Sequence, residues 1–313
     1  MISVVCPVLN EEKYIGSLLD FFVGIEPVEK EIWIADGGSV DGTRDVLNNY
    51  ASKYSTIHWI KNDHKYVPFA LNNLIQRCSG EIIVRWDAHT TYAPDYLTAV
   101  LATFAKTNAD IVGGPMRAIG NNSFQAAVAY ATSTPFGVGN SNFHFENFEG
   151  LTDSVYLGAW RRQVFEKVGY FDEQMLRNQD DEFHYRAKEA GLKIYQDPKI
   201  CSWYYPRDSL RNLMSQYYQY GLFKPLVIRK NRSEWKLRHL VPSLFITYLL
   251  FIPVAMLVHF VAIVPLIFYL LLVFVFSAKA PNVKPKLWCT VIFPALHLSY
   301  GAGFILGLFR GSK

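Results

Sequence analysis

Short apolar runs alternate with amphipathic stretches along the first third of the chain. The apolar runs cover residues 2–6, 31–35, 56–60, 81–86 and 109–114, and are rich in the branched and aromatic residues typical of β-strands. The stretches 14–22, 43–54, 68–78 and 95–106 repeat apolar residues at helical spacing. Strands that alternate with helices of this length predict an α/β fold, a mostly parallel sheet with helices on both faces.

The last quarter of the chain has a different pattern. No charged residue appears from Leu240 through Ala278, and a second uncharged run extends from Leu287 to Phe309. A membrane-spanning helix needs about 20 mostly apolar residues. A buried core helix is the alternative, but the first run is longer than ordinary globular helices. We therefore expect a globular domain at 1–225 and, at 226–313, a basic segment with three transmembrane helices near 240–258, 261–278 and 288–309.

Basic residues flank these apolar runs and predict how they are oriented. Those before the first run are Lys224, Arg229, Lys230, Arg232, Lys236 and Arg238, and those between the runs are Lys279, Lys284 and Lys286. If the first run turns back near His259, both groups lie on one side of the membrane, which the positive-inside rule makes cytoplasmic. Residues 1–225 would then face the cytoplasm.

Composition adds little to this picture. The formal net charge of +4 over 313 residues gives no reason to expect nucleic acid as a partner. Four cysteines are scattered without CxxC spacing, so neither a zinc site nor a disulfide framework is indicated.

Polar residues follow three of the predicted strands. The first strand leads into "PVLNEEK", the second into "DGGSVDGT" with Asp36 at its tip, and the fourth into "DAH" with Asp87 and His89. Ligands of parallel sheets bind at the carboxyl ends of the strands, so these loops predict a composite site. Turn and helix-cap roles are the alternative, and we adopt it for Asp41 and Thr43. No GxGxxG follows the first strand, which argues against a dinucleotide site.

Five segments resemble, in order, the inverting nucleotide-sugar glycosyltransferases of family 2, which have the GT-A fold. They are "VVCPVLNEEKYI", "IADGGSVDGT", "ALNNLIQRCSGEIIVRWDAH", "DEQMLRNQDDEFHYRAKEAGLKI" and "SLRNLMSQYYQYGLFK". The variants "RWDAH" and "NQDDEFHYR" are most similar to the branch that builds bacterial exopolysaccharides of the succinoglycan type. The resemblance implies a hexosyltransferase with a UDP-sugar as donor.

The resemblance also implies roles on the donor side. Asp36 would bind the uracil base, with Pro7, Leu9 and Glu11 lining the nucleotide pocket. Asp87 matches the first carboxylate of the D-x-D motif, near the ribose and the metal ion. His89 stands where the second carboxylate contacts that ion; imidazole suits Mn²⁺ better than Mg²⁺, which prefers oxygen. A turn role for His89, with water holding the ion, is the alternative.

On the acceptor side, Asp180 matches the family's catalytic base, which removes the proton from the attacking hydroxyl. Glu182 matches the second acid of the motif, while Gln179 replaces its first Glu, so one negative charge beside the base is missing. Acids at a helix start also stabilise the helix dipole, which is our interpretation of Asp181.

Further acceptor residues are predicted around Gly158 and the segment before the membrane. Gly158 lies where the family has its acceptor-side strand, and the two arginines at 161 and 162 could hold a pyrophosphate or cover a helix start. Gln216 is kept from the Q-x-x-R-W motif of processive relatives, whereas Gln219 and Tyr220 replace its Arg and Trp. This departure favours transfer of a single sugar. Tyr220 could stack on an acceptor sugar or lie at the membrane interface.

Together these features predict a membrane-anchored enzyme of the bacterial inner membrane, with its catalytic domain in the cytoplasm. It would transfer one sugar from a UDP-sugar to a lipid-linked saccharide in exopolysaccharide or other surface polysaccharide synthesis, alongside polysaccharide-assembly proteins. A polyprenyl-phosphate sugar synthase is one alternative. A catalytically silent nucleotide-binding membrane adaptor is another, which would account for His89 and Gln179.

Overall fold

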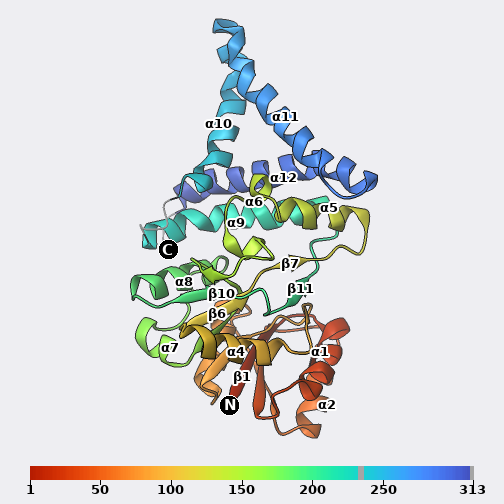
Figure 1. Ribbon diagram of the computed structural model, residues 1–313, viewed down its shortest axis with the longest axis vertical. Coiled ribbons are helices and arrows are strands. Elements are labelled where there is room, and N and C mark those ends of the chain that lie inside the picture. The colour runs from red at the N-terminus through yellow and green to blue at the C-terminus, as the bar shows by residue number, and fades with distance from the viewer. Residues whose placement is uncertain (232–235, 311–313) are drawn as a thin grey trace. The chain divides into compact units, whose positions relative to one another are not determined.

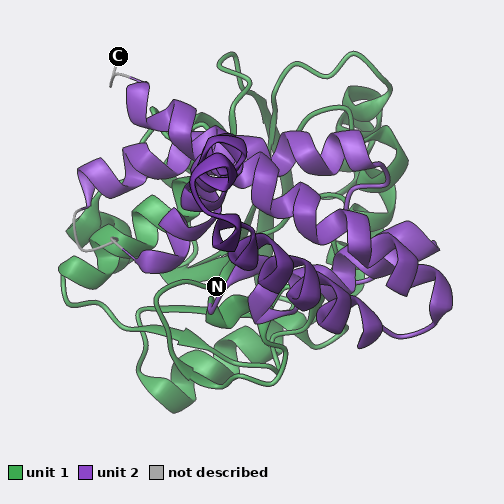
Figure 2. Cartoon of the chain, turned by 90° about the horizontal axis from the view of Figure 1, so that it is seen from above, with its two compact units in different colours: residues 1–117, 141–204 green, residues 118–140, 205–313 purple. Residues whose placement is uncertain are grey.

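The computed structural model describes residues 1–231 and 236–310, so Arg232 of the predicted basic group lies outside the described residues (Figure 1). The chain forms two compact units, one of residues 1–117 and 141–204 and the other of residues 118–140 and 205–313 (Figure 2). The predicted boundary at 225 therefore differs from the observed division. The reason is that residues 118–140 and 205–230 form helices whose apolar faces pack against the C-terminal helix.

The first unit is built on an eight-stranded sheet of order β3-β2-β1-β4-β9-β6-β10-β8. The parallel strands β1 to β4 are Ile2–Val8, Lys30–Asp36, Ile57–Lys61 and Ile82–Arg85. Strand β9 (Tyr156–Arg161) runs antiparallel between β4 and β6 (Ile111–Gly114); β10 (Ile194–Gln196) is parallel to β6, and β8 (Gly150–Leu151) is antiparallel to β10. A three-stranded sheet contains β5 (Thr91–Tyr92), β11 (Ser202–Tyr204) and β7 (Arg117–Ala118). The predicted α/β class with a mostly parallel sheet is confirmed.

Helices cover both faces of the large sheet, as its alternating side chains require. On β1, Val4 and Cys6 enter one core and Val5 enters the other. The first core takes buried residues from α1 and α4, and the second from α3, α7 and α8. The helices of this unit are α1 (Glu12–Gly24), α2 (Thr43–Lys53), α3 (Val67–Arg77), α4 (Tyr96–Thr107), η1 (Asn142–His144), α7 (Gln163–Val168) and α8 (Gln179–Glu189).

The second unit is helical. It contains α5 (Ser123–Thr132), α6 (Pro135–Val138), α9 (Leu210–Lys230), α10 (Leu237–Val258), η3 (Phe260–Ile263), α11 (Val264–Ala278) and α12 (Val283–Phe309). Within the described residues, three segments are long and apolar enough to cross a membrane: Leu237–Val258, Phe260–Ala278 and Val283–Phe309. They coincide with the three predicted spans apart from their ends.

Candidate active site

Three neighbouring strands bring the predicted donor-side loops together. In the parallel register, Val8 of β1 pairs with Asp36 of β2, and Val5 pairs with Arg85 of β4. The segments that follow these strands therefore leave the sheet along one edge, where the α/β fold places its ligands. Pro7, Leu9 and Glu11, the residues predicted to line a nucleotide pocket, are half-buried at this edge.

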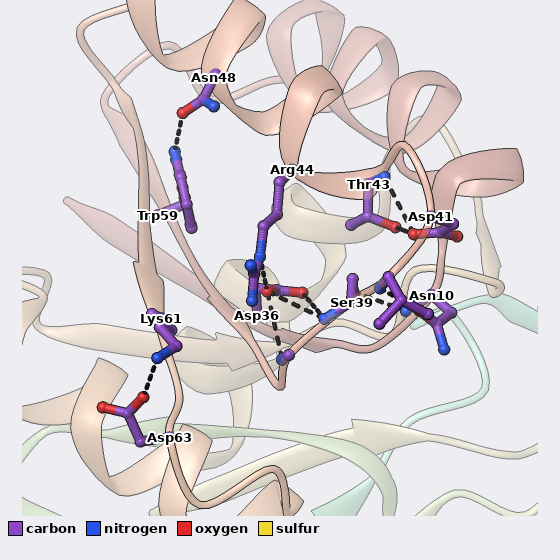
Figure 3. A network of polar contacts seen from close by, with 12 residues as sticks. Asn10, Asp36, Ser39, Asp41, Thr43, Arg44, Asn48, Trp59, Lys61 and Asp63 are labelled. Carbon is purple, nitrogen blue, oxygen red and sulfur yellow. Dashed lines mark hydrogen bonds and ion pairs between the residues drawn. The ribbon is translucent and has the colours of Figure 1, made fainter.

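Asp36 lies fully buried at the end of β2 and organises the loop that follows it (Figure 3). Its carboxylate accepts hydrogen bonds from the backbone N–H of Ser39 at 3.1 and 3.2 Å and of Gly38 at 3.3 Å. Arg44 Nε forms an ion pair with Asp36 Oδ2 at 2.6 Å. Burial alone would raise the pKa of Asp36, but the hydrogen bonds from Ser39 and Arg44 outweigh it and lower that pKa. The carboxylate is thus an anion whose observed partners belong to its own loop and to α2.

Gly37 and Gly38, directly after Asp36, allow the backbone of this loop to turn sharply and to approach Lys65 closely. Gly38 has a φ of +96°, a conformation that side chains disfavour. A β-carbon at Gly37 would lie 2.8 Å from the Lys65 carbonyl oxygen. Asn10 ties this loop to the one after β1, because its side chain accepts from the Val40 N–H at 2.9 Å and its own N–H donates to Ser39 Oγ at 2.8 Å. The two loops therefore form one connected surface.

We expect Asp36→Asn to lower stability, because an amide cannot accept from both the Ser39 N–H and Arg44 as the carboxylate does. The expected loss is about 1–3 kcal/mol, the usual effect of leaving buried donors without an acceptor. Asp63→Asn is a matched control, since Asp63 is 72% exposed and pairs with the exposed Lys61. Thermal unfolding of the purified variants in detergent measures both; equal melting temperatures would contradict this account of Asp36.

Asp87 and His89 follow β4, and each is held by a neighbour. The backbone N–H of Asp87 donates to the Tyr92 hydroxyl at 2.7 Å. His89 Nδ1 lies 2.9 Å from Glu11 Oε1. Histidines that ligate metals usually have their other ring nitrogen held in this way by a carboxylate. In this arrangement Nε2 is the atom by which His89 would ligate a metal, and Glu11 orients the ring.

The residues present can supply part of a metal site. In the described ranges, no group of three or more His, Cys, Asp and Glu side chains is placed to hold a metal ion. Asp87 and His89 offer one carboxylate and one imidazole, a donor pair that suits Mn²⁺ better than Mg²⁺. A divalent ion held here would need further oxygen ligands from a substrate.

Arg85 contacts both Asp87, which the sequence predicts on the donor side, and Asp180, which it predicts on the acceptor side. It ends β4, it is 7% exposed, and its Nη1 contacts both carboxylate oxygens of Asp180 at 2.8 and 2.6 Å. Its Nη2 lies 3.3 Å from Asp87 Oδ1. Burial alone would lower the pKa of Arg85, but the charges of Asp180 and Asp87 outweigh it and raise that pKa. Arg85 is therefore a permanent cation between them.

The sequence interpretation assigned no role to Arg85. The available signal was a charged residue at the end of an otherwise apolar strand, in "EIIVRW". Such a residue must be paired when the strand is buried on both faces. Its partner Asp180, in the first turn of α8, lies 95 positions further along the chain, so the pairing itself required the fold.

Two predicted acceptor-side residues have structural partners. Glu182 is buried and pairs with Arg186 at 2.6 Å, while the other N–H groups of Arg186 donate to the carbonyls of Val168 at 2.7 Å and Tyr170 at 2.8 Å. At Gly158, a β-carbon would lie 3.0 Å from the Trp160 ring. These contacts favour structural roles: Glu182, through Arg186, ties α8 to the segment at the end of α7, and Gly158 leaves room for the Trp160 ring.

Helix α8 also carries a buried imidazole one turn beyond Asp180. His184 Nδ1 lies 2.9 Å from the Ser154 hydroxyl, and a β-carbon at Gly158 would lie 3.6 Å from His184 Nε2. Burial lowers the pKa of His184, although the charges of Asp180 and Asp181 oppose this effect. His184 is therefore neutral near pH 7.

Arg161, the last residue of β9, and Arg162, directly after it, cover helix ends. Arg161 donates to the carbonyls of Ala109 at 3.0 Å and Phe104 at 3.2 Å. Arg162 donates to those of Gly80 at 2.9 Å and Cys78 at 2.8 Å. The contacts favour a covering role over pyrophosphate binding, but the ends covered are the C-terminal ends of α4 and α3 and not the helix start that was expected.

The remaining predicted residues belong to the second unit. Gln216 and Tyr220 lie one turn apart on α9, and Gln216 Nε2 donates to the Tyr220 hydroxyl at 2.9 Å. The bond joins the retained glutamine to the residue that replaces the family's tryptophan.

Comparison with known proteins identifies the family. The sequence profile described as Glycosyl transferase family 2 matches residues 3–169. The chain belongs to this family. Its relatives include the succinoglycan biosynthesis protein ExoA of Rhizobium meliloti, 30% identical over 84% of this chain and 80% of the relative.

A second relative aligns along the whole chain. It is the dolichyl N-acetyl-alpha-D-glucosaminyl phosphate 3-beta-D-2,3-diacetamido-2,3-dideoxy-beta-D-glucuronosyltransferase of Methanococcus voltae, 28% identical over 100% of this chain and 98% of that protein.

Solved structures show the same GT-A fold. The mannosyltransferase PcManGT of Pyrobaculum calidifontis, in complex with GDP-Man and Mn²⁺, has a TM-score of 0.65 at 17% identity and covers 95% of this chain and 85% of its own. TarS 1–349 of S. aureus, in complex with UDP-GlcNAc, has a TM-score of 0.54 at 14% identity and covers 97% and 90%. The predicted GT-A architecture of this family 2 glycosyltransferase is thus confirmed.

Proposed function

We propose that this glycosyltransferase is membrane-anchored and transfers one sugar, with inversion, from a UDP-sugar to a lipid-linked saccharide. The observation that carries the proposal is the bridge through Arg85, which holds a helix-borne carboxylate, Asp180, beside the strand-end carboxylate Asp87. An inverting transfer needs these two groups close together but with different tasks. One assists the leaving nucleotide, and the other removes a proton from the acceptor.

In this mechanism Asp180 is the base. Its carboxylate takes the proton from an acceptor hydroxyl while that oxygen bonds to the anomeric carbon, and the bond from that carbon to UDP breaks on the opposite face. The Asp180 side chain is 38% exposed, so an acceptor can reach it. The two N–H···O contacts from Arg85 orient both oxygens.

The donor side completes the mechanism. A Mn²⁺ or Mg²⁺ ion bound by Asp87 and His89 would neutralise the charge that develops on the diphosphate. Glu11 orients His89, and Pro7, Leu9 and the Asp36 loop shape the nucleotide pocket. The complexes of PcManGT with GDP-Man and Mn²⁺ and of TarS with UDP-GlcNAc support a sugar nucleotide and a metal.

The acceptor is proposed from the relatives and from the apolar helices. The Methanococcus voltae relative is named for transfer to a dolichyl-phosphate-linked sugar, with a β-linked product. Inversion gives a β-linked product from an α-linked sugar nucleotide. ExoA is named for succinoglycan biosynthesis, which supports a polysaccharide pathway with further assembly proteins. We place the enzyme in the bacterial inner membrane, with the catalytic unit in the cytoplasm.

UDP release by membranes that contain the full chain tests this function. A panel of UDP-sugars is offered with no acceptor, with polyprenyl phosphate, and with a lipid-linked saccharide. We expect one UDP-sugar to be turned over, and only when the lipid-linked saccharide is present. Turnover with polyprenyl phosphate alone would replace the proposal by a polyprenyl-phosphate sugar synthase. Nucleotide binding with no turnover in any arm would make the protein a silent adaptor.

Metal dependence provides a separate prediction for His89. We expect chelator to abolish turnover, Mn²⁺ to restore it better than Mg²⁺, and His89→Ala to weaken metal activation. His89→Asp supplies the oxygen ligand that Mg²⁺ prefers, so it should raise the ratio of Mg²⁺-supported to Mn²⁺-supported turnover. Titration of each metal against initial rate measures the effect. An unchanged metal ratio in both variants would remove His89 from the metal site.

A further inference from the structure

Helix α12 differs from the other two apolar helices in how much of it the protein covers. By length and composition it could cross a membrane. Half of its most apolar window is buried within the protein, compared with 11% for Leu237–Val258 and for Phe260–Ala278. A helix that crosses beside only two others would leave most of its surface uncovered by protein, as α10 and α11 do.

The element that covers α12 is a polar helix. Helices α9 and α12 lie side by side (Figure 1), and glycines bring their backbones together: a β-carbon at Gly221 would collide with the Tyr300 carbonyl oxygen, and one at Gly303 with that of Tyr218. Helix α9 cannot cross a bilayer, because it carries charged and amide side chains along its length, namely Arg211, Asn212, Gln216, Gln219, Lys224, Arg229 and Lys230. Since α12 runs alongside it, α12 lies in the same layer.

Both ends of α12 are tied to this layer. At its C-terminal end, Arg229 Nη1 donates to the Arg310 carbonyl at 2.8 Å, and Nη2 donates to that of Leu308. Near its N-terminal end, Trp288 packs edge to face on Phe124 of α5, with ring centroids 5.2 Å apart. Neither end extends away from α5 and α9, as one end of a crossing helix must.

The start of α10 and the end of α11 both pack against α12. A β-carbon at Gly301 would lie 2.5 Å from the carbonyl oxygen of Pro242, near the start of α10. The ring of Phe276, near the end of α11, lies 6.2 Å from that of Phe293. These two helix ends lie on one side of the membrane if the pair is a hairpin that crosses twice. Helix α12 then connects them along that side (Figure 1).

The charges agree with this arrangement. Lys284 and Lys286 lie at the start of α12 and Arg310 at its end. A single crossing would place one of these basic ends outside, against the positive-inside rule. The outer side of α12 is apolar, with large exposed residues suited to the boundary between lipid head groups and acyl chains. They are Leu287, Trp288, Val291, Leu306 and Phe309.

We propose that α12 lies along the cytoplasmic surface of the bilayer, bound to lipid by this apolar side, and that α10 and α11 alone cross the membrane. This replaces the three-span prediction for residues 240–309. The loop at His259 would then face the outside, while the end of α12 would face the cytoplasm with α9. Three crossings would place both of these points on the same side.

Cysteine labelling of the full chain distinguishes the two topologies. One variant carries His259→Cys in the exposed turn after α10, and another carries a cysteine appended after Lys313. A membrane-impermeant maleimide is applied to intact spheroplasts and again after permeabilisation, with the wild type giving the background from its four native cysteines.

We expect the cysteine at 259 to be labelled in intact spheroplasts and the appended one only after permeabilisation. Labelling of both on the same side of the membrane would overturn the proposal. So would release of the chain from membranes by alkaline carbonate, because a helix pair that crosses the bilayer resists extraction. A second readout is brominated lipid, which should quench tryptophan fluorescence less in Trp288→Phe than in wild type; equal quenching counts against a lipid contact at α12.

Discussion

Asp180→Asn is expected to lower turnover by about 10²–10⁴-fold, the usual contribution of a general base. The amide keeps the size of the side chain but cannot accept the proton of the acceptor hydroxyl. Affinity for UDP should stay close to that of the wild type, because the nucleotide loops after β1, β2 and β4 are unchanged. Initial rates with the donor identified by the UDP-sugar panel, together with UDP titration, measure both quantities.

The neighbouring acid gives the matched control for this result. Asp181→Asn removes a carboxylate from the same turn of α8, where we interpret its role as helix stabilisation. It should lose little turnover. If Asp180→Asn and Asp181→Asn retain similar activity, Asp180 is not the base, even if the protein transfers a sugar.

Arg85→Met is expected to give the second large loss, about 10²-fold in kcat, because it removes the cation that orients Asp180 and neutralises Asp87. A displacement of about 1 Å in a catalytic group can cost that much. Arg85→Lys should rescue only part of it, since one ammonium cannot bind both oxygens of Asp180 and reach Asp87 as the guanidinium does. The donor KM should change less than kcat.

Turnover and melting temperature, measured together, distinguish a loss of Asp180 orientation from a general loss of stability. Arg85 is buried, so Arg85→Met is also expected to lower the melting temperature. Arg161→Met, which removes an arginine that donates to backbone carbonyls at the end of α4, is the comparison for stability. If both variants lose turnover only in proportion to their loss of folded protein, Arg85 does not position the base.

The hydrophobic pattern was sufficient for the architecture of the first unit. Runs such as "ISVVC" and "EIWIA" are apolar on successive residues because β1 and β2 are buried on both faces of the sheet, and that pattern is typical of central parallel strands. The antiparallel strand β9 was only partly anticipated. It lies between β4 and β6, far from its partners in sequence, and no local signal encodes such an insertion.

The sequence supplied candidate site residues but not their contacts. Strand ends and family motifs singled out Asp36, Asp87, His89 and Asp180 as candidates. They could not show that Asp36 is enclosed by its own loop, or that Glu11 orients His89, because these pairings depend on side-chain directions in the folded sheet. The observed division differs from the predicted boundary at 225 for a similar reason. The sequence of α9 resembles the end of the catalytic domain of the family. In the structure, however, close contacts at glycines join α9 to α12.

The packing of α5 against α12 has a consequence for the order of synthesis. Helix α5 is made before the second half of the catalytic unit, but Phe124, Ala127 and Val128 share a core with Ile292 and Phe293 of α12, which are translated long after it. The apolar side of α5 therefore stays uncovered until α12 has been made. A shortened protein that stops after the catalytic unit would keep that side bare permanently, so soluble expression would require removal of residues 118–140 as well.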